Sequence, residues 1–130
     1  MFEGIKLFES LSQDELKNLA LFCQERTLNE WEILFKQWDE SNSMYVVKSG
    51  LLQAYTYEKI LGTIQSGEIV WEMAVFNEPQ HRMASVKALQ NSELIVIISY
   101  SLEQLIKKHP NIVQKIQTVI AERKEKNQNK

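Results

Sequence analysis

The sequence predicts a mostly β protein, an antiparallel β-roll (a double-stranded β-helix of the jelly-roll type) with one helix before it and two after it. Three observations predict this class. The chain has 130 residues, the size of one domain. Apolar residues at helical spacing occupy its two ends, and short β-rich runs between polar clusters fill its middle. We therefore expect a single domain over residues 1–130, helical at 1–25, with the roll at 26–100 and C-terminal helices at 101–126.

The N-terminal helical segment is predicted from a cap and an apolar face. Ser12-Gln13-Asp14-Glu15 has the form of a capping box, in which Ser12 and Glu15 satisfy backbone N–H groups at a helix start. An apolar face follows at helical spacing, made of Leu16, Leu19, Ala20 and Cys23. Cys23 is the only cysteine, so it is interpreted as a small core residue, and an internal disulfide is excluded.

The middle of the chain is predicted to form the strands of the roll, and its end to form helices. The β-rich runs are Ile33–Phe35, Met44–Val47, Leu51–Tyr57, Ile60–Ile64, Met83–Leu89 and Leu94–Ser99. Their regular spacing is typical of an antiparallel sandwich or roll. Ser101 is the predicted N-cap of the next helix. Pro110 ends that helix and opens the last one, which has an apolar stripe from Ile112 to Ile120.

Composition and charge exclude several classes of function. The net charge is −2 and the pI is near 5.7, so no overall basic field attracts nucleic acid, and we expect no DNA-binding element. No apolar run reaches membrane-spanning length, which favours a cytoplasmic protein without a membrane partner. His81 and His109 have no metal-ligand spacing and are predicted to be exposed. The chain has no catalytic triad or phosphate-binding loop, so we expect neither an enzyme nor a metal site.

The stretch from Gly67 to Ala88 contains the candidate binding residues. Glu72 and Arg82 lie on either side of a short apolar turn and a polar bend. A strand, a one-turn helix and a strand would place both charged groups over one hollow of the size of an anion. Arginine offers a rigid fork of donors that suits phosphate, and glutamate accepts from a hydroxyl such as that of ribose. The first turn of the short helix, at Met73 and Ala74, adds free backbone N–H groups.

This stretch resembles the phosphate-binding cassette of cyclic-nucleotide-binding domains, the family of the catabolite activator protein and of protein kinase A regulatory subunits. The family pattern is roughly Gly-Glu-x-x-Gly-Glu-x-Ala, a variable bend, and Arg-x-Ala-Ser/Thr-Val-x-Ala. The matching runs here are Gly67-Glu68, Trp71-Glu72-Met73-Ala74 and Arg82-Met83-Ala84-Ser85-Val86-Lys87-Ala88. The resemblance covers most of the chain and implies the β-roll fold, without the helix-turn-helix of the family's transcription factors.

The resemblance also implies a role for each matching residue. Arg82 would pair with the cyclic phosphate, and Glu72 would accept a hydrogen bond from the ribose 2′-hydroxyl. Met83 and Ala84 would donate backbone N–H groups to the phosphate. Family members that bind cGMP often have a hydroxyl at the position of Met83, so cAMP is the expected ligand ahead of cGMP. Ser85 either assists the phosphate or simply alternates on a strand.

Three family glycines are tryptophan in this chain, namely Trp31, Trp38 and Trp71. A side chain where the backbone must stay strained costs about 1–3 kcal/mol, and an indole at Trp71 would narrow the ligand site. Two accounts remain open. Either the domain is degenerate and its pocket is blocked, or the gene reads UGA as glycine and the tryptophans are glycines in the natural protein. A UGG codon at any of the three positions would exclude the second account there.

The sequence thus indicates a regulatory module that senses a cyclic nucleotide and relays binding through its C-terminal helices to a protein effector or a second copy. The stripe residues Ile116, Val119 and Ile120 would cap the base, pack against the roll or pair two copies. A scaffold that kept the roll and lost the ligand stays open. A cupin-like metalloenzyme on a similar roll would need a cluster of inward histidines, which two isolated histidines do not supply.

Overall fold

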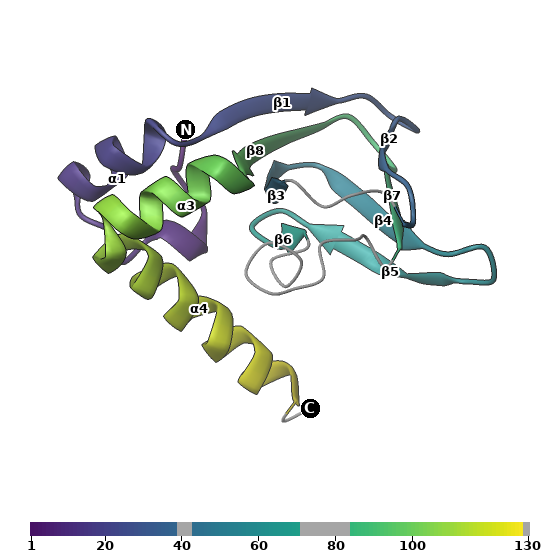
Figure 1. The fold of residues 1–130 in the computed structure, drawn as a ribbon. Helices are drawn as coiled ribbons and strands as arrows, with labels where there is room; N and C mark the ends of the chain where they lie inside the picture. Colours follow the sequence, from purple (N-terminus) through teal and green to yellow (C-terminus); the bar gives the residue numbers. More distant parts are fainter. Residues whose placement is uncertain (39–42, 71–83, 129–130) are drawn as a thin grey trace.

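Two four-stranded antiparallel sheets and flanking helices form the fold, which is known here from a computed structural model (Figure 1). The structure describes residues 1–38, 43–70 and 84–128, except for the side chains of residue 120 and residues 123–128. The strand orders are β1-β8-β3-β6 and β2-β7-β4-β5. The elements are η1 (Lys6–Phe8), α1 (Gln13–Ala20), β1 (Gln24–Leu28), β2 (Ile33–Phe35), β3 (Ser43–Ser49), β4 (Leu51–Tyr55), β5 (Ile60–Gln65), β6 (Ile69–Val70), β7 (Ser85–Ala88), β8 (Ser92–Ile98), α3 (Ser99–Lys108) and α4 (Pro110–Gln128). The predicted mostly β fold with helices at both ends is confirmed.

The helical N-terminal segment is shorter than predicted, because β1 begins at Gln24 and pairs with β8 along its whole length. Only Leu28 of this strand is buried, so its sequence has no alternating apolar pattern. Cys23 lies after α1 rather than on it, and it packs partly buried against the helical core. Burial raises the pKa of its thiol to about 12, so the side chain stays protonated at neutral pH.

The first sheet has two buried faces, because neighbouring residues of β3 and β8 point to opposite sides. Met44 and Val46 of β3 join the helical core, whereas Tyr45 and Val47 point into the space between the sheets. The same alternation continues along β8 from Leu94 to Ile97. Both strands therefore have nearly continuous apolar sequences. The roll interior and the helical core share this one sheet as their common wall.

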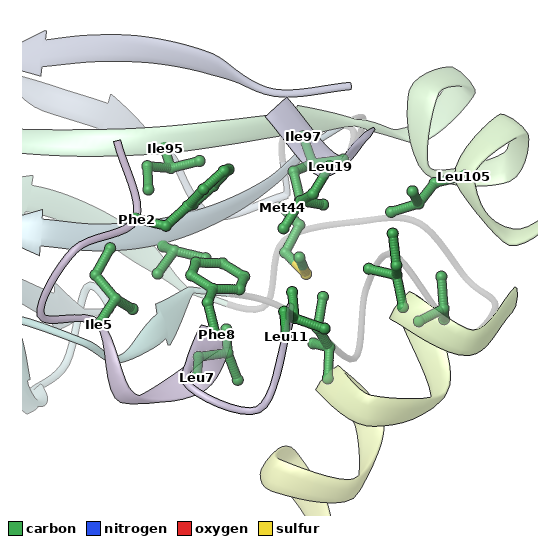
Figure 2. Packing of buried hydrophobic residues seen from close by; sticks show 14 of the residues in the cluster. Phe2, Ile5, Leu7, Phe8, Leu11, Leu19, Met44, Ile95, Ile97 and Leu105 are labelled. Atoms are coloured by element: carbon green, nitrogen blue, oxygen red, sulfur yellow. The ribbon is translucent and has the colours of Figure 1, made fainter. Parts of the chain in front are cut away.

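The helical core occupies the outer face of that sheet, where η1, α1, α3 and α4 gather (Figures 1 and 2). Three residues of the predicted α4 stripe, Ile112, Val113 and Ile116, are buried in this core. Val119 packs against it partly exposed, and the side chain of Ile120 lies outside the described residues. Of the three roles predicted for Ile116, Val119 and Ile120, packing against the roll is the one seen for Ile116, which shares its cluster with residues of β3 and β8.

The start of α3 differs from the prediction, whereas the start of α4 agrees with it. α3 begins at Ser99, and Ile98 is its N-cap without a side-chain hydrogen bond, so the predicted cap at Ser101 is wrong. The antiparallel pairing of β8 ends at Ile98 and determines where the helix can start. Pro110 opens α4 as predicted. His109, between the helices, is half-buried with its ring centroid 6.1 Å from that of Phe22, not exposed as predicted.

The predicted capping box at the start of α1 is confirmed, and it also binds α4. Ser12 Oγ accepts from the Glu15 N–H at 3.2 Å, and Glu15 Oε1 accepts from the Ser12 N–H at 2.9 Å. The same carboxylate oxygen accepts from Lys115 Nζ at 2.7 Å. The pKa of Glu15 lies below its ordinary value of 4.5, first because of the hydrogen bond from Lys115 and then because of the N–H of Ser12.

We expect Glu15→Gln to lower thermal stability at neutral pH and to lose its effect in acid. A lowered pKa stabilises the folded state at pH values above 4.5, and this stabilisation disappears as pH falls through the folded-state pKa below 4.5. Melting curves of the variant and the wild type should therefore converge below pH 4.5. Glu103→Gln removes an exposed carboxylate on α3 and should leave stability unchanged across this range. A gap that widens in acid would contradict the expectation.

Two of the tryptophans have the backbone conformation of glycine. Trp31 has φ 70° and Trp38 has φ 75°, and they are the non-glycine residues with positive φ in the described chain. Their side chains are largely exposed, so no core packing compensates the strain. Residues with a Cβ rarely adopt this left-handed backbone conformation, which costs them about 1–2 kcal/mol each. The prediction that these positions belong to tight turns suited to glycine is consistent with this geometry. Trp71 lies outside the described residues.

Trp38→Gly should therefore stabilise the protein, by about 1–2 kcal/mol. The matched variant is Trp38→Ala, which also removes the exposed indole but keeps the Cβ that strains the backbone at positive φ. Chemical denaturation should show the glycine variant to be more stable than the alanine variant. Equal stability of the two variants would contradict the expectation, because a Cβ at position 38 would then cost nothing in this turn.

Candidate functional site

The predicted cassette runs between two buried ends, one in each sheet. Val70 ends β6 in the first sheet and is 1% exposed, and Ala84 precedes β7 of the second sheet and is fully buried. The cassette therefore lies, in the sequence, between a strand of the first sheet and a strand of the second. Of the predicted binding residues, Ala84 and Ser85 are described. The remaining predictions lie outside the described residues, and they are Trp71, Glu72, Met73, Ala74, Arg82 and Met83.

The interior of the roll is apolar over the described part of the chain. It is lined by side chains from both sheets, including Tyr45, Leu52, Val86 and Leu94. The buried polar side chains of the described ranges are all serines, namely Ser43, Ser85 and Ser92. Such an interior can surround a flat apolar surface but supplies no charge to an anion. Among the described residues, the roll interior therefore offers no buried charged contact to a ligand.

Ser85 is the predicted site residue whose contacts the structure does describe. Its side chain is 9% exposed at the start of β7, where Ser85 pairs with Tyr55 of β4. On the side of β2, its Oγ accepts a hydrogen bond from the backbone N–H of Gln37 at 2.8 Å. Ser85 is thus more than an alternating strand residue, because its hydroxyl holds a turn that is remote in sequence.

Sequence reasoning did not find the contact between Ser85 and Gln37. The two residues are 48 positions apart, so no local spacing signals it. Their proximity depends on the register of β2 and β7, which shifts between Ile33 and Phe35. The shift is a β-bulge, and it lets the consecutive residues Leu34 and Phe35 both be buried.

Other kinds of site have little support from the described residues. His, Cys, Asp and Glu side chains do not gather in threes as a metal site would need, within residues 1–38, 43–70 and 84–128. Over the same part of the chain, none of the helices is both long and apolar enough to span a bilayer. The hypothesis of a metalloenzyme on a similar roll therefore gains nothing from this geometry.

Comparison with known proteins identifies the family. The model of the cyclic nucleotide-binding domain matches residues 25–109, which is most of the chain. This chain belongs to the cyclic nucleotide-binding domain family. The matched segment of this cyclic nucleotide-binding domain covers α3 and all of the roll except Gln24, and it includes the cassette between β6 and β7. The family resemblance predicted from the cassette is thereby confirmed.

The relatives of this domain described next are longer proteins. It is 25% identical to a putative potassium channel protein of Rhodopseudomonas palustris, over 99% of this chain and 32% of the channel. It is also 25% identical to the cyclic AMP receptor protein of Thermus thermophilus, over 93% of this chain and 58% of the receptor. The chain thus spans about a third to somewhat over half of these relatives.

The fold of the domain agrees with solved structures of the family. The catabolite activator protein of Thermus thermophilus superposes with a TM-score of 0.78 at 24% identity, over 94% of this chain and 59% of that chain. The predicted β-roll with flanking helices is confirmed by this similarity together with the two antiparallel sheets. A family of this kind is regulatory, and its model matches residues 25–109 of this chain.

Proposed function

We propose that this cyclic nucleotide-binding domain is a regulatory module that binds cAMP in the roll, with the phosphate and ribose held by the cassette. One observation supports this most directly. The roll interior is apolar and contains no buried charged side chain in the described residues, whereas the segment joining its two buried ends contains both Glu72 and Arg82. Charge recognition is therefore concentrated in one short segment, and the apolar walls suit a purine base.

Each cassette residue has a chemical role in this proposal. Arg82 pairs with the exocyclic oxygens of the cyclic phosphate through its guanidinium fork. Glu72 accepts from the ribose 2′-hydroxyl. Backbone N–H groups of Met83 and Ala84 complete the phosphate contacts in this proposal, and those of Met73 and Ala74 add further donors to the same anion.

The preference for cAMP over cGMP rests on Met83. A hydroxyl at this position could accept from the guanine amino group, whereas the thioether of methionine is a weak acceptor. Competition binding measures this preference directly, and tighter binding of cGMP would refute it.

The relay of binding is proposed to pass through the shared sheet. β3 and β8 line the roll interior with one face and pack against α1, α3 and α4 with the other. A ligand that favours one arrangement of these strands would also favour one arrangement of the helices, which is how binding shifts a conformational equilibrium. A protein partner or a second copy would then contact α4 beyond Ile112, Val113 and Ile116, which are already buried in the helical core.

A thermal-shift screen with cAMP, cGMP and cyclic dinucleotides tests the function. Ligand at 100 times its dissociation constant should stabilise the folded state by about 2.7 kcal/mol. The second candidate, a roll that no longer binds nucleotide, is favoured by the strain at Trp31 and Trp38 and by the tryptophan at position 71. It predicts no shift with any of the nucleotides. The variant with glycine at all three positions should then restore binding if the tryptophans alone block the pocket.

A further inference from the structure

The start of β7 is held from both sides, by different kinds of hydrogen bond. On one side Ser85 continues the antiparallel ladder with Tyr55 of β4. On the other side the backbone pairing with β2 is interrupted by the bulge before Phe35. Past the bulge, the hydroxyl of Ser85 takes over as the acceptor for the N–H of Gln37, at 2.8 Å. A side chain thus replaces a backbone carbonyl where the two strands separate.

This hydrogen bond joins the turn after β2 to the start of β7. Gln37 is half-buried, and the next residue, Trp38, turns the chain with φ 75°. This hydrogen bond is partly buried, and a fully buried N–H without an acceptor would cost about 1–3 kcal/mol. The bond therefore favours the position of the turn seen here. Ala84 is fully buried beside this contact, and Met83 and Arg82 immediately precede it in the sequence.

We propose that Ser85 is a positioning residue of the nucleotide site, which acts by fastening the turn from Lys36 to Trp38 to the strand that leaves the cassette. This inference rests on the proposed function. The hydroxyl acts through Gln37, and the phosphate is bound by the neighbouring arginine and backbone N–H groups. Preorganised donors bind an anion more tightly than donors that must be ordered during binding.

The test compares Ser85→Ala with Ser92→Ala, because Ser92 is a matched control in the other sheet. Ser92 is 1% exposed, and its Oγ accepts from the backbone N–H of Leu51 at 3.1 Å. Each variant removes one buried acceptor for a backbone N–H, so both should lower the melting temperature by several degrees, roughly 3–8 °C. Calorimetry should show cAMP affinity reduced about tenfold in Ser85→Ala and changed less than twofold in Ser92→Ala. Ser85→Thr keeps the hydroxyl and should restore affinity.

Two measurements separate a positioning role from direct contact with the ligand. Hydrogen exchange at the Gln37 amide should be slow in the wild type and in Ser85→Thr, and fast in Ser85→Ala. Gln37→Pro removes the donor and leaves Ser85 in place. Positioning predicts that Gln37→Pro loses as much affinity as Ser85→Ala and that the double variant loses no more. Additive losses, or full affinity in Gln37→Pro, would assign the hydroxyl to the ligand instead.

The outcomes for this inference differ from those for the proposed function. If the wild type binds cAMP and Ser85→Ala binds it equally well, the positioning role is refuted and the function stands. If the wild type binds none of the cyclic nucleotides, both fall. If Gln37→Pro does not fold, the exchange rate of the Gln37 amide in the Ser85 variants still shows whether the hydrogen bond to Ser85 protects it. The cAMP affinities of those variants then show whether this hydrogen bond contributes to binding.

Discussion

Arg82→Ala is expected to weaken cAMP binding by about 2–5 kcal/mol, the range for removing one partner of a desolvated charged contact. This corresponds to a loss of roughly 30-fold to several-thousand-fold in affinity. The loss is large because the described interior of the roll has no other buried charged side chain to take over the phosphate. Isothermal calorimetry measures the effect, and the melting temperature without ligand should stay near that of the wild type.

Two further variants sharpen this prediction. Arg82→Lys keeps the charge but loses the planar fork of donors, so it should restore only part of the affinity. Arg26→Ala removes an exposed arginine of β1, which is outside the cassette, and should leave affinity unchanged. If the wild type binds cAMP and Arg82→Ala binds it equally well, Arg82 is excluded as the phosphate-binding residue.

Gly50→Ala should destabilise the fold by about 2–6 kcal/mol, combining steric overlap of about 1–3 kcal/mol with backbone strain of similar size. Gly50 joins β3 to β4 with φ 107°. A Cβ there would lie 2.6 Å from Ser92 Cα and would overlap Ser92 Oγ as well. Since β8 is the central partner of both β1 and β3, the clash cannot be relieved without disturbing the shared sheet. Denaturant unfolding gives the loss directly.

Gly4→Ala is the matched control for Gly50→Ala. Gly4 has φ 75°, but a Cβ at this position would have no atom within 4 Å. Its loss should reflect the strain alone, about 1–2 kcal/mol. Adding Ser92→Ala to Gly50→Ala removes the overlapping hydroxyl yet leaves the overlap with the backbone, so it should not rescue stability. Equal losses at Gly4 and Gly50 would show that the close approach to Ser92 is relieved at little cost.

Local features of the fold could be predicted from the sequence because the interacting residues are close along the chain. The capping box joins Ser12 and Glu15, and the bonds were found as expected. Pro110 opens a helix because its ring already has the φ of a first helical turn. The positive φ angles of Trp31 and Trp38 fall at turns that the family resemblance had marked as glycine positions.

Predictions were less successful where a partner strand decides the structure. β1 has four exposed residues out of five and lacks a strand pattern, so only its pairing with β8 makes it a strand. The predicted cap at Ser101 failed because the strand before it ends earlier, at Ile98. The pattern of α4 predicted an apolar stripe correctly, but it could not say that Ile112, Val113 and Ile116 face the helical core.

By itself the sequence determined the class of fold and the family, because these depend on residue types at short spacing. The binding roles of Glu72 and Arg82 stay predictions. Only the tertiary structure decided that one sheet separates the roll interior from the helical core. It also decided that Lys115 donates a hydrogen bond to Glu15, 100 positions away in the sequence. The hydrogen bond from the Gln37 N–H to Ser85, 48 positions away, likewise depends on it. Strand register and helix packing bring such pairs together, and both are set by how the whole chain buries its apolar side chains.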